Sequence, residues 1–134
     1  MAVQTEKYPH NEGFLVSEAN GSRSRSNVTL DASVAVALQA GTVLATDSAG
    51  NYVQLDLAAT DGTEIASAIL LQDFEVTGVA TPVAVINRDA EVHTDELIWP
   101  AGATDNQKAT ALAQLATLGI IGRAGAATLQ VGPE

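Results

Sequence analysis

The chain contains no cysteine, and aromatic residues make up only 4% of its 134 residues. Without cysteine there is no disulfide framework, no thiolate metal ligand and no thiol nucleophile. Because alanine is abundant and aromatic residues are few, each buried position removes little apolar area from water, at about 25 cal/mol per Å². We therefore expect a core that gains stability from contacts with other subunits.

Basic residues are also scarce. Six Lys and Arg stand against sixteen Asp and Glu, giving a formal net charge of -10, and no Lys or Arg occurs between Asn27 and Asn87. Such a charge repels phosphate backbones and anionic lipid. The apolar runs are far shorter than the roughly 20 residues that span a bilayer. The N-terminus lacks a basic start followed by an apolar segment. We expect no nucleic-acid partner, no membrane partner and no signal peptide.

The length and the 46% apolar content predict a single domain. Residues 1–30 differ from the rest, because residues 1–13 are polar and residues 18–26 are rich in turn-forming residues. We expect them to form an extended N-terminal arm with one short strand in it. Residues 31–134 are then the β-rich domain.

Short apolar segments separated by turn signals fill the middle of the chain. Residues 42–45 and 52–55 flank Asp47-Ser48-Ala49-Gly50-Asn51, where Gly and Asn tolerate the positive φ of a tight hairpin. Further turn signals occur at residues 61–62 and 78–82. Four or five short strands at this spacing predict a small barrel or sandwich rather than alternating β and α units.

One helix is predicted over residues 105–118. Thr104 followed by Gln107 fits a capping box, in which the hydroxyl accepts from a free backbone N–H and the amide side chain reaches back. The helix has an apolar face that we expect to cover one open side of the strands. That face is formed by Leu112, Leu115 and Ala116.

The most enzyme-like cluster is Asp89, Glu91 and His93. On a strand these alternate residues point to one face and could hold a divalent cation, as in a metal-dependent hydrolase. The alternation with apolar residues favours an ordinary solvated face instead. No phosphate-binding glycine motif occurs, and no lysine lies at a hairpin tip to carry biotin or lipoate. We therefore expect no catalytic residue, no metal site and no cofactor.

Several blocks occur in an order that resembles the head decoration proteins of tailed bacteriophages. The resemblance covers about residues 13–123, with a longer segment than usual before the first hairpin. The blocks are the early hairpin at 42–44 and 52–56, the turn and core strand at 60–62 and 66–71, the strand at 88–92, and the Leu97-Ile98-Trp99-Pro100 corner before the helix.

This resemblance implies a mostly β fold with one short helix, a small barrel of the β-tulip kind. It also implies a structural virion protein that binds the outside of the expanded icosahedral capsid as trimers. Such trimers cement neighbouring major coat subunits and stabilise the DNA-filled head. The implied partners are other copies of the chain and the major capsid protein. The implied location is the outer capsid surface, after a stage in the host cytoplasm.

In this interpretation the coat-binding residues lie in the arm. Phe14, Leu15 and Val16 form a short strand that can add to a sheet edge on the coat protein, and Arg23 and Arg25 contact an acidic partner. Two alternatives stay open: the strand packs on its own domain, and the arginines contact the protein's own surface.

The Ile98-Trp99-Pro100 corner holds the only Trp of the chain. We expect it to be an anchor in the core or in a trimer contact, as buried aromatic residues commonly are. A tail or fibre adhesion module that binds a host glycan is the second interpretation of the chain, and it would place its few aromatic residues in an exposed pocket.

Overall fold

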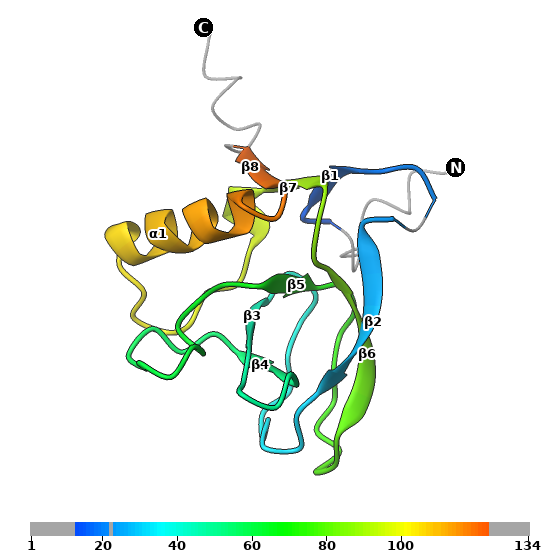
Figure 1. Ribbon diagram of the computed structural model, residues 1–134, viewed down its shortest axis with the longest axis vertical. Helices are drawn as coiled ribbons and strands as arrows, with labels where there is room; N and C mark the ends of the chain where they lie inside the picture. The colour runs from blue at the N-terminus through cyan, green and yellow to red at the C-terminus, as the bar shows by residue number, and fades with distance from the viewer. Residues whose placement is uncertain (1–12, 22, 124–134) are drawn as a thin grey trace, which may run out of the picture.

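The computed structural model describes residues 13–21 and 23–123. Strands β2, β4, β3, β5 and β6 close a barrel, and β1, β7 and β8 form a separate three-stranded sheet (Figure 1). The elements are β1 (Leu15–Glu18), β2 (Arg25–Leu30), β3 (Val43–Thr46), β4 (Tyr52–Gln54), β5 (Ala68–Leu70), β6 (Thr81–Ile86), β7 (Ala90–His93), the 3-10 helix η2 (Thr94–Glu96), α1 (Asp105–Ala116) and β8 (Ile120–Arg123). The expected fold class, mostly β with one helix, is confirmed.

The predicted hairpin is β3 and β4, paired antiparallel. In its turn the Asp47 N–H donates to the Asn51 carbonyl at 2.8 Å, and the Asp47 carboxylate accepts from the Ala49 and Asn51 N–H groups at 2.9 and 3.0 Å. Gly50 has a φ of +88°, which a side chain would disfavour. The turn residues therefore fix the hairpin as their chemistry predicts.

Alternate residues of the barrel strands point into two different apolar cores. This follows from the twofold periodicity of a strand, and it explains why β3 and β5 are buried on both faces. The first core contains Val43, Ala45, Ile69 and Ile86 with residues of β7, α1 and β8. The second core contains Leu44, Leu70 and Val85 with residues of β2 and of the loops that carry Val34, Leu38 and Phe74.

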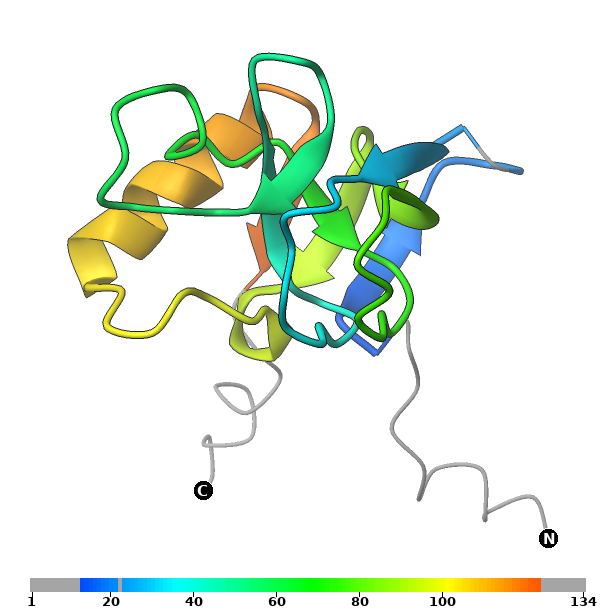
Figure 2. The ribbon, with the colours of Figure 1, turned by 90° about the horizontal axis from the view of Figure 1, so that it is seen from below.

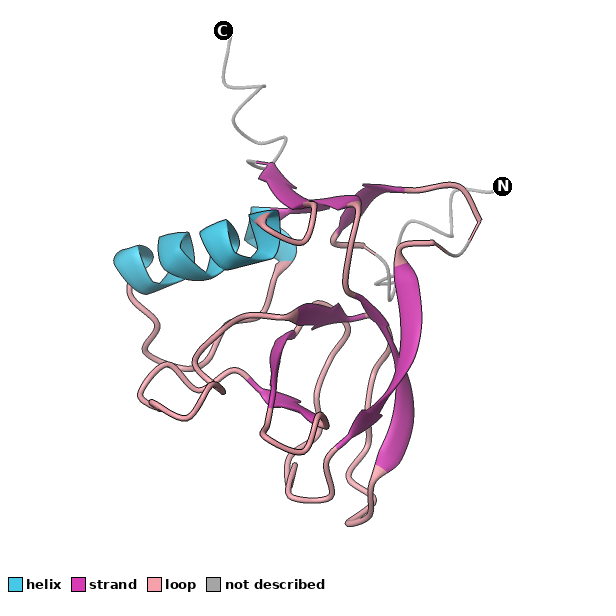
Figure 3. Cartoon of the chain, in the orientation of Figure 1, coloured by secondary structure: helices cyan, strands magenta, loops and turns pink. Residues whose placement is uncertain are grey.

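Helix α1 lies against the barrel, next to the small sheet (Figure 3). Its capping box is present: Thr104 Oγ1 accepts from the Gln107 N–H at 3.1 Å, and Gln107 Oε1 accepts from the Thr104 N–H at 2.9 Å. Ala111 and Leu115 are its buried residues, whereas Ala116 is exposed. The apolar face is therefore turned slightly from the predicted one, and Gln114 Oε1 accepts from the Ala66 N–H of the barrel at 2.8 Å.

The small sheet joins segments from the two ends of the described chain. β1 pairs antiparallel with β7, and β8 pairs parallel with β7 on the other side. The structure thereby brings residues 14–18 and 25–30 of the expected arm into the folded body, because β7 offers β1 a partner within the same chain. Residues 1–12 of that arm, Ser22, and the tail at 124–134 lie outside the described residues.

Candidate functional site

The three residues of the expected arm strand have different surroundings. Phe14 is 2% exposed in the first core, and its carbonyl accepts from the His93 N–H at 2.7 Å. Leu15 packs partly buried against the same core. Val16 is 43% exposed. Of the two alternatives left open by the sequence, the structure shows the strand packed on its own domain, with Val16 as its surface side chain.

The two arginines of the arm also differ. Arg25 donates from Nε and Nη2 to the two carboxylate oxygens of Glu18, at 2.8 and 2.6 Å. These hydrogen bonds lower the pKa of Glu18 from its ordinary value of 4.5, against the opposing effect of partial burial. Arg23 lies exposed in the turn between β1 and β2. Arg25 therefore ties β1 to β2 within the chain, and Arg23 is the more accessible charge.

The described arginines all lie at the sheet end of the molecule. Arg88 precedes β7 and donates to Asn87 Oδ1 at 2.7 Å, and Arg123 at the end of β8 donates to Glu91 at 3.1 Å. The stretch from β2 to β6 carries no Lys or Arg between Asn27 and Asn87. Its acidic residues are Asp31, Asp47, Asp56, Asp61, Glu64, Asp73 and Glu75. The charges are therefore segregated, with mixed charge at the sheet end, which includes Arg25 at the start of β2, and only negative charge on the rest of the barrel.

The Ile98-Trp99-Pro100 corner is bound to the barrel through its backbone. The Val43 N–H donates to the Ile98 carbonyl at 3.1 Å, and the Ile98 N–H donates to the Gly41 carbonyl at 2.9 Å. Ile98 is 36% exposed, and Trp99 is half-buried against the first core. The corner is thus fixed in place while it still presents apolar surface.

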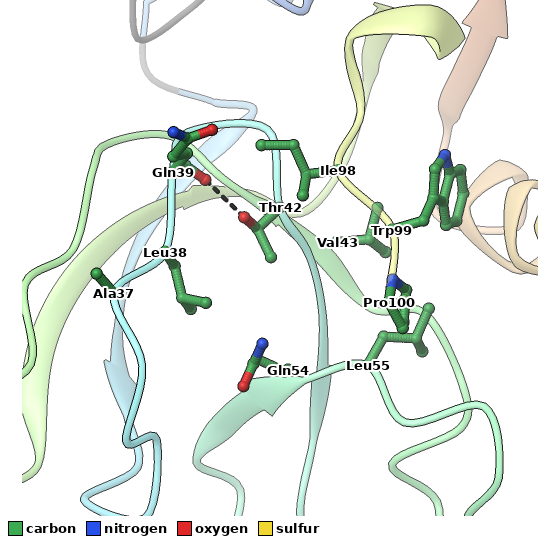
Figure 4. Close-up of a pocket in the computed structure, with 10 residues that line it drawn as sticks. All are labelled: Ala37, Leu38, Gln39, Thr42, Val43, Gln54, Leu55, Ile98, Trp99 and Pro100. Carbon is green, nitrogen blue, oxygen red and sulfur yellow. Dashed lines mark hydrogen bonds between the residues drawn. The ribbon is translucent and has the colours of Figure 1, made fainter. Parts of the chain in front are cut away.

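Two grooves meet at Trp99. The first, which we name the corner groove, has a volume of about 330 Å³ (Figure 4). It is lined by Ala37, Leu38, Gln39, Thr42, Val43, Gln54, Leu55, Ile98, Trp99 and Pro100. The second, which we name the helix groove, has a volume of about 430 Å³ and lies between residues 94–99 and α1. It is lined by Thr94, Asp95, Leu97, Trp99, Lys108 and Leu112.

The proposed metal cluster does not converge. Asp89 lies before β7, in a backbone turn with a φ of +48°, and Glu91 is paired with Arg123. Within residues 13–21 and 23–123, no three acidic or histidine side chains are grouped closely enough to hold a metal ion. The hydrolase interpretation depended on such a grouping of Asp89, Glu91 and His93.

The aromatic residues of the described part of the chain are mostly internal. Phe14 and Phe74 are 2% and 5% exposed, and Tyr52 is half-buried beside the second core. Trp99 is the aromatic residue that lines the corner and helix grooves. An adhesion site with several exposed aromatic residues is therefore not seen in the described part of the chain, where also no helix is long and apolar enough to cross a bilayer.

The family model described as bacteriophage lambda head decoration protein D matches residues 3–120 of the chain. The chain belongs to this family. A comparison with curated protein sequences gives no match. The chain is therefore a structural protein of the phage head, and its family places it at the capsid surface.

The family match spans this decoration protein from before β1 to the first residue of β8. It leaves out residues 1–2 and 121–134. Among them is Gly122 of β8, which lies so close to Thr94 and Leu112 that an added Cβ atom would come within 2.6 Å and 3.3 Å of their side chains. The sequence offers one signal for that close approach, which is the glycine inside the strand, Gly122.

Sequence reasoning missed Ser24 of this decoration protein. Its side chain is fully buried, donates to the Asp89 carbonyl at 2.6 Å and accepts from the Ala19 N–H at 2.8 Å. A single serine in a serine-rich turn carries no signal of such a role. Ser24 joins the β1–β2 turn to the β6–β7 turn.

Proposed function

We propose that this chain binds the outside of the expanded phage head as homotrimers and cements neighbouring major coat subunits. The observation that carries the proposal is family membership over residues 3–120. No chemical step is needed for such a role, because contacts across subunit boundaries are enough to hold a shell together. Assembly from subunits released into the host cytoplasm, without nucleic acid, fits the net charge of -10.

The end of the molecule that carries the small sheet is the proposed coat-facing end. Both edge strands of that sheet, β1 and β8, lie at the ends of the described chain. The same end holds Arg23, Arg25, Arg88 and Arg123. The acidic part of the barrel between Asn27 and Asn87, pointing away from the shell, keeps unbound protein soluble, while mixed charge on the other end provides complementary contacts.

Val16 and Arg23 are the described residues of the expected arm that are best placed for coat contact. Val16 is 43% exposed on an edge strand, where the backbone of a coat segment can add to the sheet. Three such edges on one trimer would act together, since one bound edge holds the others at high effective concentration.

The corner groove is the proposed trimer contact. Its wall contains Ile98, which is 36% exposed on a backbone that is hydrogen-bonded on both sides. A rigid apolar corner of this kind costs little conformational entropy when a neighbour packs against it. Trp99 and Pro100 complete the wall.

The test of capsid binding uses expanded heads that lack decoration protein, mixed with the purified chain and separated by sedimentation. We expect saturable binding to expanded heads and much weaker binding to unexpanded ones. Val16→Asp together with Arg23→Glu should weaken binding by at least tenfold, which corresponds to about 1.4 kcal/mol. Val79→Asp, at a barrel loop position that is 61% exposed, is the matched control and should bind as the natural chain does.

The test of the trimer contact is the mass in solution, measured by analytical ultracentrifugation. Ile98→Asp should shift the chain from trimer to monomer, whereas Val79→Asp should not. If Ile98→Asp still forms trimers, the corner groove is not part of the trimer contact. If the natural chain never forms trimers, the proposed cementing mechanism is wrong.

A further inference from the structure

The turn that joins β1 to β2 contains an asparagine followed directly by a glycine, Asn20-Gly21. Both residues lie outside the strands and are exposed. Figure 2 shows this blue turn projecting from the side of the molecule, in agreement with Figure 1. Asn20 is the one asparagine of the chain that a glycine follows. The other described asparagines, which precede larger residues, are Asn27, Asn51, Asn87 and Asn106.

An Asn-Gly pair carries both partners of a spontaneous reaction. The backbone nitrogen of the glycine attacks the side-chain carbonyl carbon of the asparagine, a C–N bond forms, and ammonia leaves with the proton of that nitrogen. Water then opens the resulting five-membered succinimide ring at either carbonyl, which leaves an aspartate or an isoaspartate. One water is consumed and one ammonia is released. Glycine favours the attack because it has no side chain to shield the nitrogen and its backbone rotates easily.

The surroundings of Gly21 leave room for this attack. Gly21 has a φ of +68°, and a Cβ atom added to it would meet no atom within 4 Å. Within residues 13–21 and 23–123, no hydrogen bond holds the side-chain amide of Asn20 or the N–H of Gly21. The carbon that is attacked and the nitrogen that attacks it can therefore approach each other.

The two ends of the turn are fixed. Arg25 donates to both carboxylate oxygens of Glu18, at 2.8 and 2.6 Å. One step further into the turn, the Ala19 N–H donates to Ser24 Oγ at 2.8 Å. These contacts hold β1 and β2 in place on either side of Asn20-Gly21. The exposed tip of the turn can therefore react without unfolding of the domain.

A second pair, Asp61-Gly62, shows how the fold can prevent the same chemistry. Asp-Gly forms the same succinimide with loss of water, and Gly62 has a φ of +106° with nothing within 4 Å of an added Cβ atom. Its N–H, however, donates to Glu64 Oε1 at 2.8 Å. Asp61 Oδ1 accepts from the Thr63 N–H and hydroxyl at 3.1 and 2.7 Å, and these bonds lower the pKa of Asp61 from its ordinary value of 3.8. Both reacting groups of Asp61-Gly62 are thus held, and the carboxylate stays ionised and unreactive.

We propose that Asn20 deamidates in the folded protein through a succinimide with the Gly21 nitrogen, and that this reaction adds a carboxylate to the β1–β2 turn. The new negative charge arises on the mixed-charge end of the molecule, in the turn that also carries Arg23. An isoaspartate product also lengthens the backbone between Ala19 and Ser24. The reaction belongs to the isolated chain and does not depend on capsid binding.

The purified full chain is kept folded in buffer at neutral and at mildly alkaline pH, and is followed by isoelectric focusing and by tandem mass spectrometry of its peptides. We expect one more acidic form, with aspartate or isoaspartate at position 20. It should build up several-fold faster at the higher pH, because only the deprotonated nitrogen attacks. If position 20 remains asparagine at alkaline pH, the proposal is wrong.

Variants of the pair identify the reacting atoms. Asn20→Gln needs a less favourable six-membered ring and should remove the acidic form. Gly21→Ala should slow the reaction at least tenfold, which corresponds to about 1.4 kcal/mol in activation free energy, but alanine also disfavours the positive φ. Asn27→Gln, at an exposed asparagine followed by valine, is the matched control and should react as the natural chain does. An acidic form that persists at the same rate in Asn20→Gln would contradict the proposal.

Unfolding in urea separates the effect of the fold from that of the sequence. Labelling by an isoaspartyl methyltransferase should detect position 20 in both the folded and the unfolded chain. It should detect position 61 in urea alone, because the hydrogen bonds from Thr63 and to Glu64 are then lost. Labelling of position 20 in urea alone would show that the folded turn protects Asn20, and would overturn the proposal.

Discussion

The barrel and the small sheet with its helix differ in how the chain builds them. The barrel comes from one continuous stretch, β2 to β6, and it has the second core to itself. The small sheet is assembled from the segments on either side of that stretch, with β1 on one edge and β8 on the other. The barrel is therefore the scaffold, and the layer around β7, β8 and α1 is an addition whose two edge strands, β1 and β8, remain open.

The two regions also divide the surface between them. The barrel stretch carries acidic residues without Lys or Arg between Asn27 and Asn87, whereas the arginines of the described residues flank the small sheet. The barrel closes on itself, whereas the sheet end carries the open strand edges and the mixed charge that we propose the coat protein recognises.

The largest effects should come from removing a fully buried leucine on each side of this division. Leu44 belongs to the second core and Leu115 of α1 to the first, and both are 0% exposed. Each change to Ala should lower the free energy of unfolding by about 4 kcal/mol. In hydrogen exchange, Leu115→Ala should leave the barrel amides protected, whereas Leu44→Ala should lower protection in both regions. Equal loss of protection everywhere in both variants would mean that the barrel is not an independent scaffold.

The next effect tests the place where the Trp99 corner meets the barrel. Gly41 has a φ of +100°, and a Cβ on it would lie 2.9 Å from the Glu96 carbonyl oxygen. Gly50 in the hairpin turn has a φ of +88° but nothing within 4 Å. Gly41→Ala should cost about 3 kcal/mol, since backbone strain and a steric clash add, and Gly50→Ala about 1 kcal/mol. Equal costs in urea unfolding would show that the close approach at Gly41 is unimportant.

A smaller effect is expected at the joint formed by Ser24. Ser24→Ala removes both hydrogen bonds of a side chain that is 0% exposed. Leaving the Asp89 carbonyl and the Ala19 N–H without this partner should cost about 2 kcal/mol. Ser48→Ala, exposed in the β3–β4 turn, is the matched control and should be near neutral. Thermal unfolding of the two variants gives the comparison. An unchanged stability of Ser24→Ala would show that the Ser24 hydrogen bonds do not hold the two turns together.

The smallest effect is the pH-dependent one between β1 and β2. The hydrogen bonds from Arg25 lower the pKa of Glu18 below 4.5. The stabilisation is therefore fully present above the ordinary carboxyl pKa and is lost as the pH falls through the lowered folded value. Glu18→Gln should cost about 1 kcal/mol at neutral pH, and the difference from the natural chain should vanish in acid. If the stability difference between Glu18→Gln and the natural chain stays constant with pH, the loss of stability comes from packing and not from the charge of Glu18.

The local features of the fold were predictable from the sequence, because neighbouring residues determine them. The Asp47–Asn51 turn and the Thr104–Gln107 capping box depend on side chains that bond to nearby backbone. The partner of β1 was not predictable. A short alternating segment such as residues 14–18 carries no record of which sheet it joins, so its pairing with β7 emerged only in three dimensions.

The candidate site was predictable only in part, for the same reason. Trp99 stood out as the single Trp, and the corner at residues 98–100 was placed correctly before the helix. The helix groove forms because Lys108 and Leu112 of α1 lie opposite Thr94. That arrangement depends on how α1 packs against the rest of the fold, which the sequence does not show. The segregation of charge likewise depends on β1, β7 and β8 meeting at one end.

The most direct test of the account is an image reconstruction of expanded heads with and without the purified chain. We predict added threefold density on the outside of the shell, with the small sheet toward the coat and the acidic barrel pointing outward. Heads that show no added density, or density in which the barrel end contacts the coat, would contradict the account.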